Sequence, residues 1–269
     1  MTSTPVTLTA PARPALSRTV SLFATTVRCE IARLLRVPAF VIPTILFPIM
    51  FFTLFGLPNI GLEIVPGVKA GPYMLAAFGA YSMLSAALFS FGTSIATERG
   101  LGWNRLLRVT PMKPGVYLLA KAVNALIIGL ITLLALFAFA AVAGHVTMTL
   151  GAWLSLLVRL LGGMIPFIAL GLWIGYFGGP NSASPITNLI FLPMSFASGL
   201  FVPIHQLPKF VQDIAPYLPA YHSGNLAWDA VGGGDGKDLI HLAWLVGYTV
   251  FFLLIALIAY RKDEGKNFG

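Results

Sequence analysis

The 269-residue sequence has few charged side chains, with 17 Lys and Arg and 9 Asp and Glu, or 10% of the chain. Soluble domains carry about 25%, so this low charge excludes an ordinary soluble domain, a disordered chain and a nucleic-acid-binding domain. A single cysteine, Cys29, excludes an intrachain disulfide and a cysteine-based metal centre. The pairs Gly236-Lys237 and Gly265-Lys266 lack the flanking Gly and Ser/Thr of a phosphate-binding loop, so we expect no ATPase motif in this chain.

Long apolar runs make up most of the sequence, which is 57% apolar with a mean hydropathy of +0.86. A helix rises 1.5 Å per residue, so about 20 apolar residues cross the ~30 Å hydrocarbon core of a bilayer. The sequence therefore predicts an all-α integral membrane protein with six transmembrane helices. We expect these spans at about residues 39–55, 72–96, 122–143, 150–177, 186–201 and 239–260.

The distribution of Lys and Arg predicts the orientation of these spans. Five Lys and Arg residues precede the first span, five lie between the second and third spans, and three follow the last span. These segments lie on one side of the membrane, whereas Lys69, Lys209 and Lys237 lie on the other side. Because Lys and Arg are enriched in cytoplasmic loops, we expect both termini in the cytoplasm of a cell membrane, specifically a bacterial inner membrane. Arg159 lies within the fourth span near its external end. Its side chain either serves a function or snorkels to the headgroups, and we favour snorkelling.

The segments outside the spans differ in character. Residues 1–16 are rich in Pro and Thr and are expected to form a disordered cytoplasmic arm, and residues 263–269 a cytoplasmic tail. Residues 17–37 predict an amphipathic helix along the cytoplasmic interface, because apolar side chains recur there at helical spacing while arginines lie opposite. The apolar positions are Val20, Phe23, Val27, Ile31 and Leu34.

The loop between the second and third spans carries a short apolar ridge. Trp103, Leu106 and Leu107 fall at i, i+3 and i+4, and Arg105 and Arg108 flank them. A ridge of this kind docks into the groove of a partner. The alternative is a short helix that rests on the membrane surface while its arginines obey the positive-inside rule.

Two further sets of residues have a structural interpretation: one predicts close packing of helices, and the other predicts a segment that re-enters the membrane. Gly171, Gly175 and Gly179 recur at four-residue spacing, a pattern that lets membrane helices approach closely. Between residues 202 and 238, short apolar stripes interrupted by prolines predict two external helices that re-enter the outer leaflet. The candidate residues of this re-entrant segment are Ser198, Gly199, Pro203, Pro208, Pro216 and Pro219.

Taken together, these features resemble the permease subunit of an ABC-2 type transporter. The run from Glu98-Arg99-Gly100 to Thr110-Pro111 resembles the family's cytoplasmic coupling helix between spans two and three. The run 196–203, followed by Leu207-Pro208 and residues 216–219, resembles the segment that ends span five and enters the external helices. The resemblance covers residues 17–262, the expected transmembrane domain. One departure is Trp103-Asn104, where we expect a second acidic residue.

The resemblance implies one half of the membrane part of an ATP-driven exporter. A second permease chain, identical or paralogous, would complete the path, and separate ABC ATPase subunits would bind ATP and Mg²⁺. This chain itself is expected to carry no catalytic residue, cofactor or metal, and to contact membrane lipid but no nucleic acid. We expect Glu98 and Arg99 to pair with ATPase charges, or else with each other. The coupling candidates are Glu98, Arg99, Trp103, Arg105, Leu106, Leu107 and Arg108.

Two other functions remain open. A secondary transporter or channel driven by an ion gradient usually has acidic residues within its spans and an internal repeat, and the sequence shows neither. An intramembrane serine protease would need a Gly two positions before its serine, whereas Phe196 occupies that position before Ser198. The four histidines, His145, His205, His222 and His241, lack the spacing of a metal-binding pair on one helix.

Overall fold

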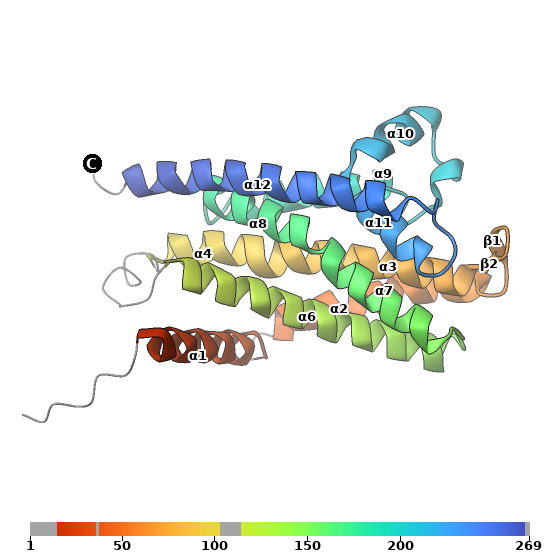
Figure 1. The fold of residues 1–269 in the computed structure, drawn as a ribbon, viewed down its shortest axis with the longest axis horizontal. Helices are drawn as coiled ribbons and strands as arrows, with labels where there is room; N and C mark the ends of the chain where they lie inside the picture. The colour runs from red at the N-terminus through yellow and green to blue at the C-terminus, as the bar shows by residue number, and fades with distance from the viewer. Residues whose placement is uncertain (1–14, 36–37, 103–113, 267–269) are drawn as a thin grey trace, which may run out of the picture.

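The computed structural model describes residues 15–35, 38–102 and 114–266, and this part of the chain is predominantly helical (Figure 1). Its N-terminal half comprises α1 (Ala15–Leu35), α2 (Pro38–Phe51), η1 (Phe52–Gly56), η2 (Leu57–Asn59), β1 (Glu63–Val65), β2 (Val68–Lys69), α3 (Ala70–Ser85), η3 (Ala86–Thr93), α4 (Ser94–Gly100) and α6 (Pro114–Val142). Its C-terminal half comprises α7 (Leu150–Gly163), α8 (Ile165–Phe177), α9 (Ala183–Ala197), η4 (Ile204–Gln206), α10 (Lys209–Ile214), η5 (Ala215–Tyr217), α11 (Pro219–Asp229) and α12 (Asp238–Lys266).

Five helical stretches of the described residues are long and apolar enough to cross a membrane. They are Ile42–Asn59, Ala70–Gly100, Pro114–Val142, Leu150–Phe177 and Asp238–Asp263. The helix at the fifth expected span, α9, has only 15 residues and ends at Ala197, four residues earlier than predicted. It ends there because Gly199 adopts a left-handed conformation with φ of +81°, which a helix cannot continue through.

The continuous helix formed by α3, η3 and α4 lies at the centre of the bundle, between α6 on one side and α8 on the other (Figure 1). Its sequence is rich in Ala and Gly, and 89% of its most apolar stretch is buried within the chain. Small side chains allow neighbouring helices to approach closely in a membrane protein. The core therefore surrounds this helix, whereas only 11% of the most apolar stretch of α12 is buried.

The two ends of the bundle are distinguished below by the elements that meet there (Figure 1). At the α4 end, α4 meets the start of α6 and the C-terminal ends of α8 and α12. At the α11 end, α11 lies near the small β1–β2 hairpin and the start of α12. The helices α3 to α4 and α12 connect the two ends, so each end is joined to the other by rigid elements.

The segments outside the spans are described only in part. The amphipathic helix expected at 17–37 corresponds to α1, which packs against α6 and α2. Residues 1–14 of the expected N-terminal arm lie outside the described residues. At the other terminus, α12 continues to Lys266, so the first four residues of the expected tail are helical.

Candidate functional sites

A buried acidic side chain lies at the α4 end, next to residues 103–113. Glu98 is 6% exposed and lies on the last turn of α4. Its carboxylate accepts a hydrogen bond from the Tyr117 hydroxyl and another from the Lys121 ammonium, at 2.7 Å. Both partners lie on α6, the helix that follows residues 103–113, so Glu98 joins the two helices that flank this segment.

Lys121 is the centre of this polar network. Its ammonium, on a side chain 3% exposed, lies 2.7 Å from the Glu98 carboxylate and 3.3 Å from that of Glu30 on α1. The hydroxyl of Ser94 accepts a further hydrogen bond from Lys121, at 3.3 Å. Removing one partner of a buried ion pair leaves an uncompensated charge in a low-dielectric interior. The network therefore holds α1, α4 and α6 in one arrangement.

Arg99, the next residue along the chain, faces the opposite side of α4. Its guanidinium forms an ion pair with Asp263 on α12, in which Nε donates to Oδ2 at 3.1 Å. The same group donates to the backbone carbonyls of Gly175 and Gly178 at the end of α8, and it lies 5.0 Å from the ring centre of Tyr176. Arg99 thus joins α4 to α8 and α12.

In the structure, therefore, Glu98 and Arg99 both form ion pairs with residues of the same chain. Sequence reasoning selected Glu98 and Arg99 as contacts for a partner protein, but it did not identify their internal partners. The local alternative was a pair between Glu98 and Arg99 themselves, and the structure instead turns them to different helices. The remaining coupling candidates, Trp103, Arg105, Leu106, Leu107 and Arg108, lie outside the described residues.

Two of the three spaced glycines lie where α8 crosses the central helix. A Cβ atom on Gly171 would lie 2.9 Å from the backbone oxygen of Ala87, and one on Gly92 would lie 2.9 Å from the oxygen of Gly171. A Cβ atom on Gly175 would lie 2.9 Å from Ile95. Gly179 lies beyond the end of α8 at Phe177, so it does not take part in this crossing.

The candidate prolines of the predicted re-entrant segment each lie at the start of a short helix. Pro203 and Pro208 immediately precede η4 and α10, Pro216 lies within η5, and Pro219 begins α11. Proline suits such positions because it fixes φ and has no amide hydrogen to leave unpaired. Ser198 is fully buried at the end of α9, and its hydroxyl makes no hydrogen bond to any described group, histidines included.

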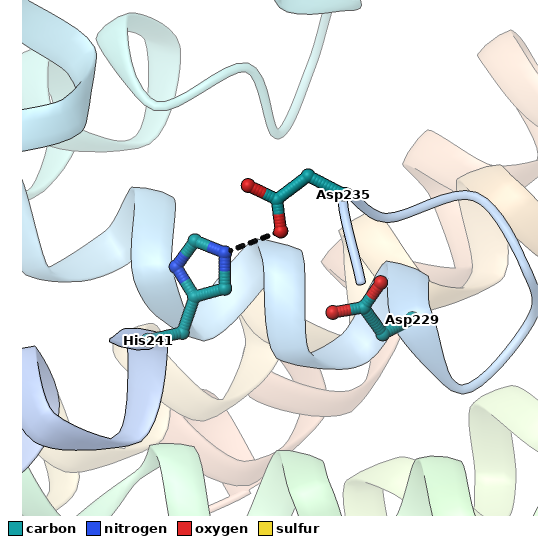
Figure 2. A group of neighbouring side chains, drawn as sticks. All are labelled: Asp229, Asp235 and His241. Carbon is teal, nitrogen blue, oxygen red and sulfur yellow. Dashed lines mark hydrogen bonds and ion pairs between the residues drawn. The ribbon is translucent and has the colours of Figure 1, made fainter. Parts of the chain in front are cut away.

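A second polar cluster, at the α11 end, was not identified from the sequence. His241, in the first turn of α12, directs its Nε2 atom to Asp235 Oδ1 at 2.9 Å, with Asp229 beside them (Figure 2). Its Nδ1 atom lies 2.8 Å from Nδ1 of His222 on α11. The two histidines are 19 residues apart and on different helices, so a search for spacing on one helix could not find them.

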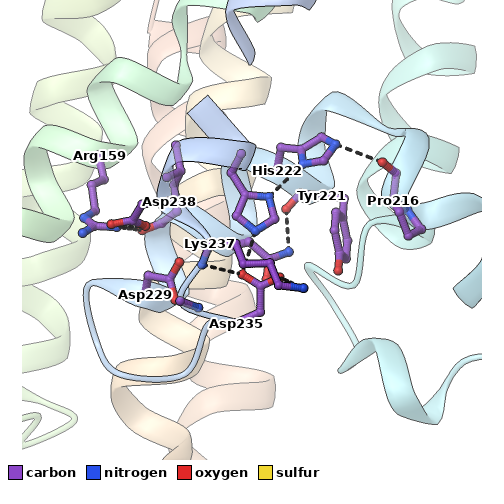
Figure 3. Close-up of polar contacts among 12 residues, drawn as sticks. Arg159, Pro216, Tyr221, His222, Asp229, Asp235, Lys237 and Asp238 are labelled. Atoms are coloured by element: carbon purple, nitrogen blue, oxygen red, sulfur yellow. Dashed lines mark hydrogen bonds and ion pairs between the residues drawn. The ribbon is translucent and has the colours of Figure 1, made fainter. Parts of the chain in front are cut away.

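The position of His222 fixes its protonation. Its Nε2 atom lies 2.9 Å from the carbonyl oxygen of Pro216, which can only accept a hydrogen bond (Figure 3). Burial, followed by the neighbouring His241 ring, lowers the pKa of His222 to about 4. His222 is therefore neutral near pH 7, with its single proton on Nε2 and a free electron pair on Nδ1.

The carboxylates of this cluster have different environments. Burial raises the pKa of Asp229. Burial would also raise the pKa of Asp235, but hydrogen bonds from His241 and from the Lys237 amide outweigh the effect of burial, and the pKa is lowered.

Asp238 forms an ion pair with Arg159, which also donates to the backbone oxygen of Leu226 at 3.2 Å (Figure 3). Arg159 thus has an acidic partner that the sequence did not identify, and snorkelling of its side chain to the headgroups stays a prediction.

Comparison with known proteins shows similarity to a transporter family and to a bacterial protein. Residues 65–258 match the family model described as "ABC-2 family transporter protein". The chain is also 28% identical over 236 residues to the "Putative transport permease YvfS" of Bacillus subtilis (strain 168), an alignment that covers 87% of this chain and 95% of that protein.

Proposed function

The chain belongs to the ABC-2 family of transporter proteins, and we propose that it is the permease subunit of an ATP-driven ABC exporter. In this proposal two permease chains, identical or paralogous, surround the translocation path. Separate ATPase subunits bind ATP and Mg²⁺ and contact residues 103–113 from the cytoplasm. Family membership itself supports a membrane transport permease rather than an enzyme.

The observation that best supports mechanical coupling is the polar network on both sides of residues 103–113. Glu98 connects α4 to α6 through Tyr117 and Lys121, and Arg99 connects α4 to α12 through Asp263. A force applied to the intervening segment would therefore move these helices together, because separating α4 from α6 would break the buried ion pair between Glu98 and Lys121. A loop that merely joined two spans would not need such anchoring.

The proposed membrane arrangement uses six spans. The five long helices cross the bilayer, and α9 serves as the short fifth span. The helices α10 and α11 then form the re-entrant segment, with the α11 end outside and the α4 end in the cytoplasm. ATP-driven closure of the ATPase subunits would pull on residues 103–113, and the central helix would transmit this movement to the path.

Co-purification tests this proposal directly. We expect Leu106→Asp to abolish recovery of the ATPase subunit, because a charge replaces an apolar side chain of the proposed docking ridge, while the permease remains in the membrane. Leu62→Asp is the matched control, since Leu62 is an exposed apolar residue next to β1, outside the spans and at the opposite end of the bundle. Normal ATPase recovery and transport in Leu106→Asp would contradict the proposal, as would transport in ATP-free vesicles driven only by an ion gradient.

A further inference from the structure

We propose that a groove between α7, α8 and α12 binds one phospholipid whose headgroup carries a phosphate and a primary ammonium, as phosphatidylethanolamine does. The groove has a volume of about 470 Å³. Arg159 and Asp238 lie at its charged end, where the two side chains form an ion pair (Figure 3). The rest of the lining is almost entirely apolar, and its main residues are Gly162, Gly163 and Pro166 on one side and Leu242, Val246 and Val250 on the other.

The break between α7 and α8 leaves one wall of this groove without side chains. The helix is interrupted just before Pro166, which has no amide hydrogen to continue the helical hydrogen bonds. Gly163 packs inward, because a Cβ atom there would lie 2.5 Å from the Ser223 hydroxyl on α11. Gly162 is exposed, and a Cβ atom on it would meet nothing within 4 Å. The space beside Gly162 is therefore open to a chain from another molecule.

The length of the groove matches one leaflet of a bilayer. On α12 it extends from Asp238 to Val250, about 18 Å at 1.5 Å per residue. One leaflet contributes half of the ~30 Å hydrocarbon core, or about 15 Å. Asp238 is the first residue of this apolar helix, so the charged end lies where the span meets the headgroups. A lipid with its headgroup at this end would lay one acyl chain along the apolar part.

Arg159 has a donor left for a phosphate. Its Nε donates to the Ser155 hydroxyl at 3.1 Å, and its Nη1 donates to Asp238 and to the backbone oxygen of Leu226. Its Nη2 makes no hydrogen bond to any residue that the structure describes, and the side chain is 27% exposed. The guanidinium group suits phosphate oxygens because its five N–H donors lie in one plane. A phosphate can therefore bind without breaking the ion pair.

Asp238 favours a headgroup that also carries an ammonium. Its side chain is 44% exposed, so its carboxylate is accessible from the groove. A headgroup with a phosphate alone would complement Arg159 but would place a second negative charge beside Asp238. An ethanolamine headgroup supplies a cation with N–H donors for the carboxylate, whereas the ammonium of choline has no N–H. The opposite charges of the pair thus match the opposite charges of an aminophospholipid.

Native mass spectrometry of the purified full-length permease, without any ATPase subunit, tests the headgroup preference. The protein in detergent would be titrated with phosphatidylethanolamine, phosphatidylcholine and phosphatidylglycerol of identical acyl chains. We expect one phosphatidylethanolamine per chain, bound about tenfold more tightly than the other two lipids, as one additional charge-assisted hydrogen bond would give. Asp238→Asn should remove the preference over phosphatidylcholine, and Arg159→Gln should weaken binding of all three lipids about tenfold.

Gly162→Leu tests the apolar part of the groove. The added side chain enters open space, so it should occupy the position of the acyl chain and weaken phosphatidylethanolamine binding at least tenfold. Gly247→Leu is the matched control, because a Cβ atom on Gly247 also meets nothing within 4 Å but the residue lies outside this groove. It should bind lipid as the wild type does. Thermal unfolding in lipid-free detergent should be the same for both variants.

Equal affinity for the three lipids, or unchanged phosphatidylethanolamine binding in Gly162→Leu, would overturn the proposal. Loss of a permease dimer in Gly162→Leu without any change in lipid binding would also overturn it, and would identify the groove as a contact with a second copy of the chain. Because only lipid binding is measured and no ATPase is present, these outcomes are independent of the proposed exporter function.

Discussion

At the scale of single residues, Lys121 shows how a charge can be used inside a bundle made mostly of apolar side chains. By sequence it is one of the basic residues that indicate a cytoplasmic loop, and such residues are normally solvated. In the structure its ammonium is buried between the carboxylates of Glu98 and Glu30. A buried charge is stable only while it has a partner of opposite charge. The effect of substituting Lys121 on stability should therefore depend strongly on whether Glu98 keeps its charge.

We predict that Lys121→Met lowers the free energy of unfolding by about 3–5 kcal/mol, because it removes the buried ammonium group that forms an ion pair with the Glu98 carboxylate. Unfolding of detergent-solubilised protein by sodium dodecyl sulfate would measure this change. The double variant Glu98→Gln/Lys121→Met should recover most of the loss, since no buried charge of this pair remains. Equal destabilisation by the single and double variants would contradict the prediction.

A matched control for this test is Lys209→Met. Lys209 also pairs with an acidic residue, Asp213, at 3.2 Å, but its side chain is 80% exposed. Exposed pairs of this type contribute at most about 1 kcal/mol, because water screens the charges. We therefore expect little change in this variant, which would show that burial, rather than the loss of any ion pair, causes the effect at Lys121.

The sequence identified Glu98 and Arg99 as important but could not identify their contacts. The partners Tyr117 and Asp263 lie 19 and 164 residues from them in the chain. Which charges meet across a bundle depends on helix rotation and packing, and neither can be read from hydropathy. The cluster around His241 was missed for the same reason, because its members come from two helices and the loop between them.

At the scale of elements, the crossing of α8 and η3 is defined by contact between backbones. Gly92 and Gly171 face each other, and a Cβ atom at either position would lie 2.9 Å from a backbone oxygen of the opposite helix. Such close approach is the main means by which membrane helices pack, since lipid provides no hydrophobic driving force between them. The backbone cannot move aside as a side chain can.

We expect Gly171→Ala to destabilise the bundle by about 1–3 kcal/mol, because the added methyl group forces α8 away from the central helix. Gly247→Ala is the control: a Cβ atom on Gly247 would meet nothing within 4 Å, and alanine favours helix by about 0.5–1 kcal/mol. Thermal unfolding of the two variants in the same detergent should therefore shift in opposite directions. A similar shift in both would show that the crossing tolerates separation.

Apolar runs were sufficient to predict where the long helices lie, but not how they begin, end or bend. The fourth expected span is divided at Met164 into α7 and α8, just before Pro166. The eight-residue π-helical segment η3 within the second span has no signal in composition. Hydropathy reports which residues avoid water, whereas these irregularities depend on how neighbouring helices pack.

At the scale of the whole molecule, the family predicted from the motifs at 98–111 and 196–219 is confirmed by the match over residues 65–258. The two ends of the bundle also differ in charge. Arg99, Arg261 and Lys262 lie at the α4 end, whereas Asp229, Asp235 and Asp238 gather at the α11 end. This asymmetry supports the proposed orientation, because the basic end is expected to face the cytoplasm.

Cysteine labelling tests the orientation, since the chain contains a single cysteine, Cys29, which is exposed on α1. In right-side-out membrane vesicles, a membrane-impermeant maleimide should label Cys29 only after the membrane is permeabilised. In the variant Cys29→Ser/Lys209→Cys, the new thiol lies on the exposed α10 helix near the α11 end, and it should be labelled at once. Labelling of Cys29 in intact vesicles would place α1 and the α4 end outside. ATP-dependent coupling through residues 103–113 would then be impossible, because the ATPase and its ATP are in the cytoplasm.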